Sequence, residues 1–463
     1  MTTNTDINKQ PLSFVEKVGY GLGDMASNFY LGFFGLFLLY YYTDIYGLAP
    51  AAVGTMLLIS KLIDAFSDPL MGLIADRTSS KWGKYRPYLL WVAVPYGLLG
   101  YAIFYGPELS TTGKLIYAYV TYISVMLAFT AVNVPYSALL AVISPVATER
   151  TKATQFRFIF AAGGGLMVAA FATPLSTWLG GGDDLLGFRL TMALFAVLSV
   201  GMFWLTFFTT RERIVLADHS ASVGDDFRGL VKNVSWIVLA IAGIILITGL
   251  VTRFASTAYY VKYYLADDGV PVLFGFFDRI AVVSSAGLIG QIVGALLTPA
   301  LVARFEKHHL VMTMCWLHAV LLVACYIVPP AYFWTIALLN FLGITTFGVV
   351  ITLLFTMYTD CAEYGEWTTG QRSSGLTVSA SMFSLKFGSA VGGALPGFIL
   401  AYVGFIANQS QSDDAIMGIR VMFNMVPAVL FFLGGCSMIL YKIDQATITQ
   451  METDLDARRV AQM

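Results

Sequence analysis

Three ionisable side chains interrupt one apolar stretch of this 463-residue chain. Lys61, Asp64 and Asp68 follow at i, i+3 and i+7, which places them on one helical face about two turns long. A charge at bilayer depth costs at least ~2.5–3.5 kcal/mol, so these groups should face a partner or a water-filled cavity. Two carboxylates can ligate a cation or hold one proton between them. The alternative is a structural ladder in which Lys61 neutralises one aspartate, although apolar packing would serve that purpose at lower cost.

Uncharged polar residues and one further aspartate occur in other apolar segments. Asp24 and Asn28 are one turn apart and share a helical face. Asn28 can exchange hydrogen bonds with a polyol, and the alternative is an interhelical hydrogen bond. Thr130 and Asn133 lie close to Pro135, which interrupts the hydrogen bonding of a helix.

Two basic residues raise the question of what neutralises them. Arg157 stands at the edge of an apolar segment, where a side chain that snorkels to the surface is the ordinary alternative to a ligand contact. Lys386 lies between apolar neighbours and requires a carboxylate. Asp24, Asp64 and Asp68 are the candidates.

The composition identifies a lipid bilayer as the surroundings of these residues. Charged residues make up 12% of the chain, where a soluble domain carries about 25%. Hydrophobic residues reach 57%, and the mean hydropathy is +0.73. A spanning helix needs roughly 20 residues with few charges. Uncharged intervals of about this length or more cover 25–43, 87–107, 115–148, 158–182, 190–210, 233–252, 280–303, 308–359, 387–412 and 421–441.

These intervals predict an all-α membrane protein with twelve transmembrane helices. Pro329-Pro330 divides the longest interval into two spans, and the charged segment 51–75 supplies the twelfth. Lys and Arg concentrate in the even-numbered connections, which predicts that both termini are cytoplasmic. The longest polar connection, 211–233, lies at the midpoint. It predicts two six-helix bundles, 1–210 and 234–463, with a substrate site at the midplane.

Several classes of function are disfavoured. The net charge of −1 offers no basic surface for nucleic acid. The four cysteines do not have the spacing of a metal site, and no cofactor is expected. An intramembrane enzyme would need a nucleophile and a base, and His318 has no evident partner; a membrane sensor would usually carry a soluble output domain.

The motifs resemble those of one transporter family. The run DAFSDPLMGLIADRT (64–78) followed by WGKYRP (82–87) is similar to the glycoside–pentoside–hexuronide:cation symporter family of the major facilitator superfamily. Further matches are YGLGD (20–24), NVPY (133–136) and DCAEYGE (360–366). The resemblance covers nearly the whole chain. It implies the major facilitator fold, no enzymatic activity, and uptake of a β-glycoside, pentoside or hexuronide with H⁺ or Na⁺ by alternating access.

The resemblance also implies roles for individual residues. A cation site is implied at Asp64, Asp68 and Thr130, and the two aspartates would be metal ligands only if the ion is Na⁺. Expected substrate contacts are Asp24, Asn28, Asn133, Arg157 and Lys386. Expected gating contacts at the cytoplasmic side are Asp76, Arg77, Glu363, Glu366 and Arg372.

Two departures from the melibiose permease branch affect the expected substrate. Asn28 and Asn133 stand where that branch has aspartates, and Ser137 replaces an aromatic residue that packs on the sugar. These changes argue against α-galactosides and make proton coupling plausible. The resulting pattern resembles the glucuronide and xyloside branches more closely. An anionic sugar would then use Arg157 or Lys386 as its counter-charge.

The expected protein is therefore a multi-pass transporter of the bacterial inner membrane, acting as a monomer on a small sugar. A lipid-moving carrier of the same fold, of the lysolipid type, is the first alternative. A sensor or an intramembrane enzyme is the second.

Overall fold

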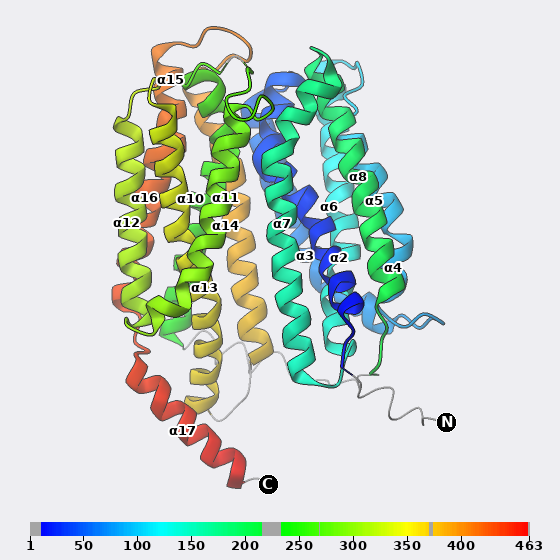
Figure 1. Ribbon diagram of the computed structural model, residues 1–463, viewed down its shortest axis with the longest axis vertical. Helices are drawn as coiled ribbons and strands as arrows, with labels where there is room; N and C mark the ends of the chain where they lie inside the picture. Colours follow the sequence, from blue (N-terminus) through cyan, green and yellow to red (C-terminus); the bar gives the residue numbers. More distant parts are fainter. Residues whose placement is uncertain (1–10, 215–232, 268, 370–373, 462–463) are drawn as a thin grey trace. The chain divides into compact units, whose positions relative to one another are not determined.

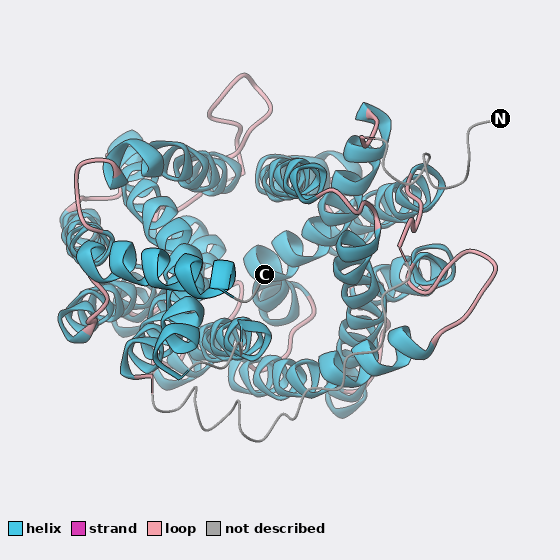
Figure 2. Ribbon diagram, turned by 90° about the horizontal axis from the view of Figure 1, so that it is seen from below, coloured by secondary structure: helices cyan, strands magenta, loops and turns pink. Residues whose placement is uncertain are grey.

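The computed structural model describes residues 11–214, 233–267, 269–369 and 374–461, and its regular structure is helical (Figure 1). The one exception within these residues is an isolated antiparallel bridge between Leu273 and Phe277. Figure 2 shows the helices of each unit mostly end-on, so within a unit they run nearly parallel or antiparallel. Arg372, one of the expected gating residues, lies outside the described residues.

The described chain forms two compact units. The first contains α2 to α8 together with segments 267–285 and 405–410. Its helices are α2 (Phe14–Phe33) with the π-helical turns η1 (Phe34–Leu38) and η2 (Tyr41–Ile45), α3 (Pro50–Arg77), α4 (Arg86–Trp91), α5 (Ala93–Ile103), α6 (Thr111–Val142), α7 (Ala147–Gly180) and α8 (Asp184–Thr209).

The second unit contains most of the helices that follow. They are α10 (Val234–Tyr259) with the π-helical turn η3 (Tyr260–Tyr264), α11 (Arg279–Val302), whose first turns belong to the first unit, α12 (Lys307–Ile327), α13 (Phe333–Thr369), α14 (Ser374–Tyr402), α15 (Asp413–Arg420) with η4 (Val421–Met425), α16 (Val426–Ser437) with η5 (Met438–Leu440), and α17 (Gln445–Ala461).

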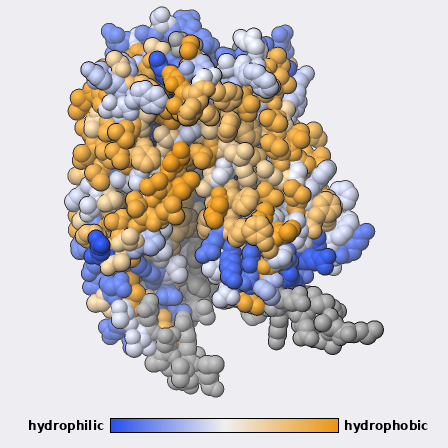
Figure 3. All heavy atoms as spheres, viewed as in Figure 1, coloured by the Kyte–Doolittle hydropathy of each residue, from blue (hydrophilic) through white to orange (hydrophobic). Residues whose placement is uncertain are grey.

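Each of the twelve predicted segments overlaps one helix or a contiguous run of helices, which confirms the all-α prediction. Among the described residues, nine helices are long and apolar enough to cross a membrane. The charged helix α3 is not one of the nine. On the face shown in Figure 3, apolar side chains gather along the middle of the helices and hydrophilic ones at their ends. The count of twelve spans and the cytoplasmic termini remain predictions.

Two segments distant in sequence pack on the first unit. The Asp278 carboxylate accepts hydrogen bonds from Thr173 Oγ1 at 2.9 Å and from the amide of Ala281 at 2.7 Å, so it joins α7 to the start of α11. Asn408 donates to the carbonyl oxygen of Asp44 at 2.5 Å. Burial raises the pKa of the Asp278 carboxyl, and the two hydrogen bonds act in the opposite direction.

The first helix of each unit ends in the same local distortion. The amide of Tyr46 donates to the carbonyl of Tyr41 at 2.8 Å, and that of Leu265 donates to Tyr260 at 3.1 Å. Both bonds span five residues, the spacing of a π-helix, which is uncommon and often found at functional sites. α2 and α10 therefore share a structural feature, as helices in equivalent positions of a repeat would.

Close packing of α10 against α14 depends on glycines along α14. A methyl group added at Gly392 would lie 2.6 Å from the carbonyl oxygen of Thr248, and one added at Gly388 would lie 2.6 Å from that of Ile244. Thr248 Oγ1 in turn donates to the carbonyl of Gly388 at 3.1 Å. Small residues at helical spacing allow this close approach of backbones.

We predict that Gly392→Ala lowers the stability by about 1–3 kcal/mol, because the added methyl group collides with backbone that cannot move aside. The thermal unfolding midpoint of the purified protein in detergent measures the change. Gly393→Ala is the matched control, because its added methyl group meets only Val251 Cγ1, at 4.0 Å. That variant should be neutral or gain about 0.5–1 kcal/mol from helix propensity. Equal losses in both variants would show that the contact does not matter.

Candidate functional site

One hydroxyl group joins the two aspartates of α3. Thr130 Oγ1, on α6, lies 2.8 Å from Asp64 Oδ1 and 3.1 Å from Asp68 Oδ1. Asp64 and Thr130 are each 2% exposed, and Asp68 and Lys61 are half-buried. Ser67 Oγ completes the group at 3.3 Å from Thr130 Oγ1. The structure thus brings together the three residues expected to form the cation site.

The hydrogen count of this cluster indicates what it can bind. A hydroxyl group has one hydrogen and two lone pairs, so Thr130 donates to only one of the two carboxylates. Its lone pairs then face an oxygen of the other aspartate. That contact becomes favourable when the second carboxyl carries a proton or when a cation lies between the oxygens. The geometry therefore suits one bound cation.

A second cluster surrounds Arg157 on α7. Its Nε lies 3.2 Å from Asp24 Oδ2 on α2, and its Nη2 lies 3.3 Å from Ser137 Oγ on α6. The guanidinium carbon is 5.1 Å from the ring centre of Tyr136, and Tyr136 stacks on Tyr20 with 4.8 Å between ring centres. Arg157 is therefore held by an ion pair with Asp24 in this structure.

The two clusters share one face of α6. Thr130, Asn133 and Ser137 are spaced i, i+3 and i+7, so they form a stripe about 10 Å long. Asn133 Oδ1 is a buried oxygen that accepts no hydrogen bond among the described residues. The side-chain amide of Asn28 donates a hydrogen bond to the backbone carbonyl oxygen of Asp24 at 2.8 Å. Asn28 and Asn133 thus lie one helical turn from Asp24 and Ser137, the two residues that contact Arg157.

Prolines weaken the helices at this site. Pro69 lies within α3 and Pro135 within α6, and each removes one backbone donor from its helix. Ser67 Oγ donates to the Asp64 carbonyl at 3.0 Å, which supplies a side-chain donor to this part of α3. Local adjustment of α3 and α6 is therefore easier beside the carboxylates than elsewhere in a regular helix.

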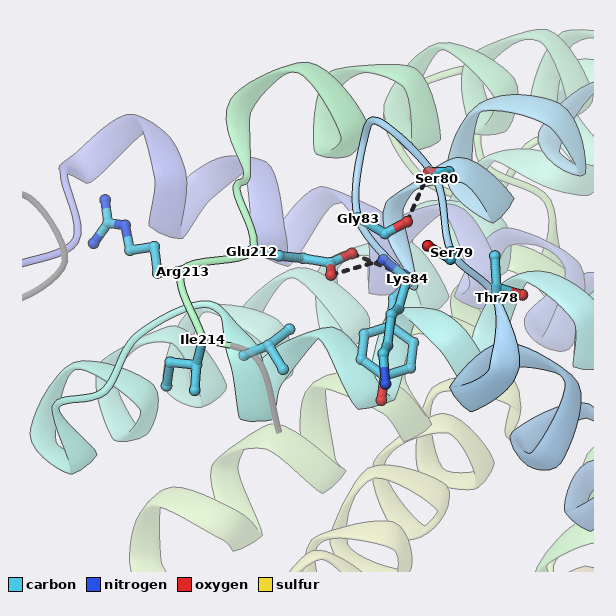
Figure 4. A pocket seen from close by; sticks show the side chains of 10 residues that line it. Thr78, Ser79, Ser80, Gly83, Lys84, Glu212, Arg213 and Ile214 are labelled. Carbon is cyan, nitrogen blue, oxygen red and sulfur yellow. Dashed lines mark hydrogen bonds between the residues drawn. The ribbon is translucent and has the colours of Figure 1, made fainter. Parts of the chain in front are cut away.

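The predicted gating residues Asp76 and Arg77 are exposed at the end of α3. Asp76 Oδ1 accepts a hydrogen bond from the Tyr85 hydroxyl at 2.7 Å. The next loop is held by Glu212, which sequence analysis did not identify. Its carboxylate accepts hydrogen bonds from the backbone amides of Lys84, Tyr85 and Arg86 at 2.9, 2.7 and 3.0 Å. Figure 4 shows Glu212 pointing toward the backbone of Lys84. The only sequence signal was an acidic residue directly after a predicted span.

Gly83 makes this contact sterically feasible. Its φ of +105° suits glycine, and an added methyl group would lie 2.4 Å from the Glu212 carboxylate. A cavity of about 340 Å³ adjoins the loop and is lined in part by Ser80, Lys84 and Arg213. The loop between α3 and α4 is thus attached to the end of α8.

The other expected site residues belong to the second unit. Glu363 and Glu366 are half-buried on the last turns of α13, and Lys386 is half-buried on α14. Beside the two glutamates, Trp367 Nε1 donates to Asp454 on α17 at 2.9 Å, and Lys307 forms an ion pair with Asp360 at 2.6 Å. Of the carboxylates considered for Lys386, Asp24 is paired with Arg157.

Arg253 on α10 is a buried cation that sequence analysis also missed, because the uncharged interval ended one residue before it. It is 2% exposed. Its guanidinium donates to Asn340 Oδ1 at 2.8 and 3.1 Å and to the Phe423 carbonyl at 2.6 Å. Its guanidinium carbon also lies 3.8 Å from the ring centre of Phe423. Arg253 therefore ties the π-helical turn η4 to α10 through uncharged partners.

We predict that Glu212→Gln loosens the loop after α3, since a neutral amide offers one acceptor oxygen to the three backbone donors. Hydrogen–deuterium exchange of peptides covering residues 79–90 should rise several-fold, with little change in the spans. Glu108→Gln, at an exposed glutamate outside this loop, is the control. Unchanged exchange at residues 84–86 would show that Glu212 does not hold the loop.

Comparison with known proteins identifies the family. A family model described as MFS/sugar transport protein matches residues 19–445. The chain belongs to this family. It is 35% identical over 434 residues to the inner membrane symporter YicJ of Escherichia coli (strain K12), covering 93% of this chain and 92% of that protein.

Two other relatives carry the name of a sugar. The isoprimeverose transporter of Lactiplantibacillus pentosus is 31% identical over 465 residues, covering 98% of this chain and 93% of that protein. The glucuronide carrier protein homolog of E. coli (strain K12) is 32% identical over 470 residues, covering 98% of both. The nucleoside transporter NupG (TM-score 0.65, 16% identity, 93% and 100% covered) and the inward-open xylose transporter XylE of E. coli (TM-score 0.64, 11% identity, 97% and 99% covered) share the fold.

These findings confirm four predictions from sequence: the symporter family, the major facilitator fold, sugar–cation symport, and a multi-pass location in the plasma membrane. The roles of single residues are a separate matter.

Proposed function

We propose that this symporter binds one coupling cation, H⁺ or Na⁺, between Asp64 and Asp68, and binds its sugar beside Asn28, Asn133 and Arg157. The observation that carries the proposal is the contact of one Thr130 hydroxyl with both carboxylates. Carboxylate and hydroxyl oxygens grouped in this way can ligate a cation or hold a proton between them. A monomer is sufficient for this function, because every residue invoked lies in one chain.

The stripe on α6 supports coupling between the two ligands. Thr130 contacts the aspartates, and Ser137, about two turns along the same helix, contacts Arg157. A cation that draws Asp64, Asp68 and Thr130 together fixes the position of α6 relative to α3. The side chains of α6 that are proposed to bind the sugar are then held in one arrangement. Cation and sugar therefore favour the same state of the protein.

The sugar site is supported by unused hydrogen-bonding capacity. Asn133 Oδ1 is a buried acceptor that a sugar hydroxyl would satisfy. Lys386 and Asp24 complete the proposed substrate contacts. We assign gating of the cytoplasmic side to Asp76, Arg77, Glu363, Glu366 and Arg372. During alternating access, contacts made by these residues would form and break as the two loaded halves of the protein move around the substrate site.

Asp64→Asn and Asp68→Asn should each abolish uphill sugar accumulation, because the cation site loses one of its two charges. Thr130→Val should raise the half-saturating cation concentration about tenfold, since a hydrogen bond to a charged group contributes about 1.5–3 kcal/mol. Thr130→Ser keeps the hydroxyl and should remain close to wild type. Transport is measured in proteoliposomes.

Separate gradients identify the ion. A sodium gradient at equal pH and a pH gradient without sodium are imposed in turn, and only the coupling ion should drive accumulation of a labelled methyl glycoside. Normal accumulation by both aspartate variants would remove the proposed cation site.

Asn133→Leu separates a binding role from a structural role. Replacing a buried, unsatisfied acceptor by an apolar group of similar size should leave the thermal midpoint unchanged or higher. Sugar affinity should fall at least about tenfold, while cation affinity changes little. A lower midpoint with unchanged sugar affinity would make Asn133 a packing residue.

A further inference from the structure

The ion pair between Asp24 and Arg157 determines the net charge of the proposed sugar site in the first unit. Asp24 is 9% exposed, and its Oδ2 lies 3.2 Å from Arg157 Nε. The positive charge of Arg157 is thus already neutralised by a group of the protein itself. The nearby side chains Asn28, Asn133 and Ser137 are uncharged.

A substrate carboxylate would compete with Asp24. To form a charge-assisted contact with Arg157, it would have to displace the Asp24 carboxylate or lie beside it. Displacement would leave the Asp24 carboxylate buried without its partner, which is strongly unfavourable. A substrate carboxylate that lies beside Asp24 would be repelled, because like charges at short distance repel. An anionic sugar therefore gains little from Arg157 while the pair is intact.

A neutral sugar meets no such competition. A guanidinium group has five N–H donors in a planar fork, and Nε and Nη2 make the contacts with Asp24 and Ser137. The Asp24 carboxylate has lone pairs on both of its oxygens. Sugar hydroxyls, which both donate and accept, can therefore bind to the edges of the ion pair without separating it.

We infer that Asp24 selects an uncharged glycoside by neutralising Arg157, so that anionic glycosides such as hexuronides are disfavoured. This inference rests on the proposed sugar site. The expectation from sequence was that an anionic sugar would use Arg157 or Lys386 as its counter-charge, and the inference reverses it for Arg157 alone. Asp24 acts through Arg157 as a determinant of specificity. Specificity is a difference of affinities, and here an unpaired buried charge disfavours the wrong substrate.

The test uses substrates that differ only in one charge. Methyl glucoside and methyl glucuronide, each in its α and β forms, are compared by binding to the purified full-length protein at pH 7 with saturating cation. The wild type should bind the neutral member at least about tenfold more tightly, a difference of about 1.4 kcal/mol. Asp24→Asn should shift the ratio of affinities at least about tenfold toward the glucuronide.

Two further variants separate charge from structure. Asp24→Glu keeps the charge and should keep the wild-type ratio. Asp24→Asn combined with Arg157→Gln removes both charges and should lose the gain in glucuronide binding. A general loss of structure would weaken both sugars together and leave the ratio unchanged.

The outcomes distinguish this inference from the proposed function. Tighter binding of glucuronide than of glucoside by the wild type, or an unchanged ratio in folded Asp24→Asn protein, overturns the role of Asp24. The wild-type ratio requires no variant, so the test stands even if Asp24→Asn does not fold. Loss of cation dependence for every sugar tested would instead overturn the proposed symport site.

Discussion

An ionised group inside a membrane needs compensation from the protein, and the first unit of this symporter meets that requirement in two ways. Asp24 and Arg157 form a pair whose charges cancel. Asp64 and Asp68 instead share the single hydroxyl of Thr130, which can donate to only one of them. In the proposed mechanism the coupling cation binds at the two aspartates, and the sugar binds beside the ion pair.

The helix α6 connects the two arrangements. It provides a hydroxyl to each cluster and the unsatisfied oxygen of Asn133 between them. Pro135 lies between Asn133 and Ser137 and removes a backbone donor, so this part of α6 can adjust at low cost. In the proposed mechanism, a change at the aspartates reaches the proposed sugar contacts through one element, over about 10 Å. Coupling in this account needs no long chain of contacts.

The helical elements and the shared face of Asp64 and Asp68 could be predicted from the sequence, because both follow from local patterns. Apolar intervals give the spans, and the i, i+3, i+7 spacing gives the face of α3; the resemblance added Thr130. The partner of Arg157 did not follow, since Asp24 is 133 residues away and periodicity fixes a face but not the helix that it meets. Glu212 was missed because its partners are backbone amides, which carry no sequence signal. Arg253 was missed because its partners are uncharged and it lies just beyond an interval defined by absence of charge.

The central claim is that cation and sugar bind to one state that α6 holds in place. Thermodynamic linkage requires that each ligand change the affinity of the other by the same factor. The most direct measurement is calorimetric titration of the purified symporter with its sugar, with and without the coupling ion, and the reverse titration. The account predicts equal factors of about 5–150-fold in wild type, falling toward one in Thr130→Val. Sugar affinity that does not depend on the cation in the wild type would contradict it.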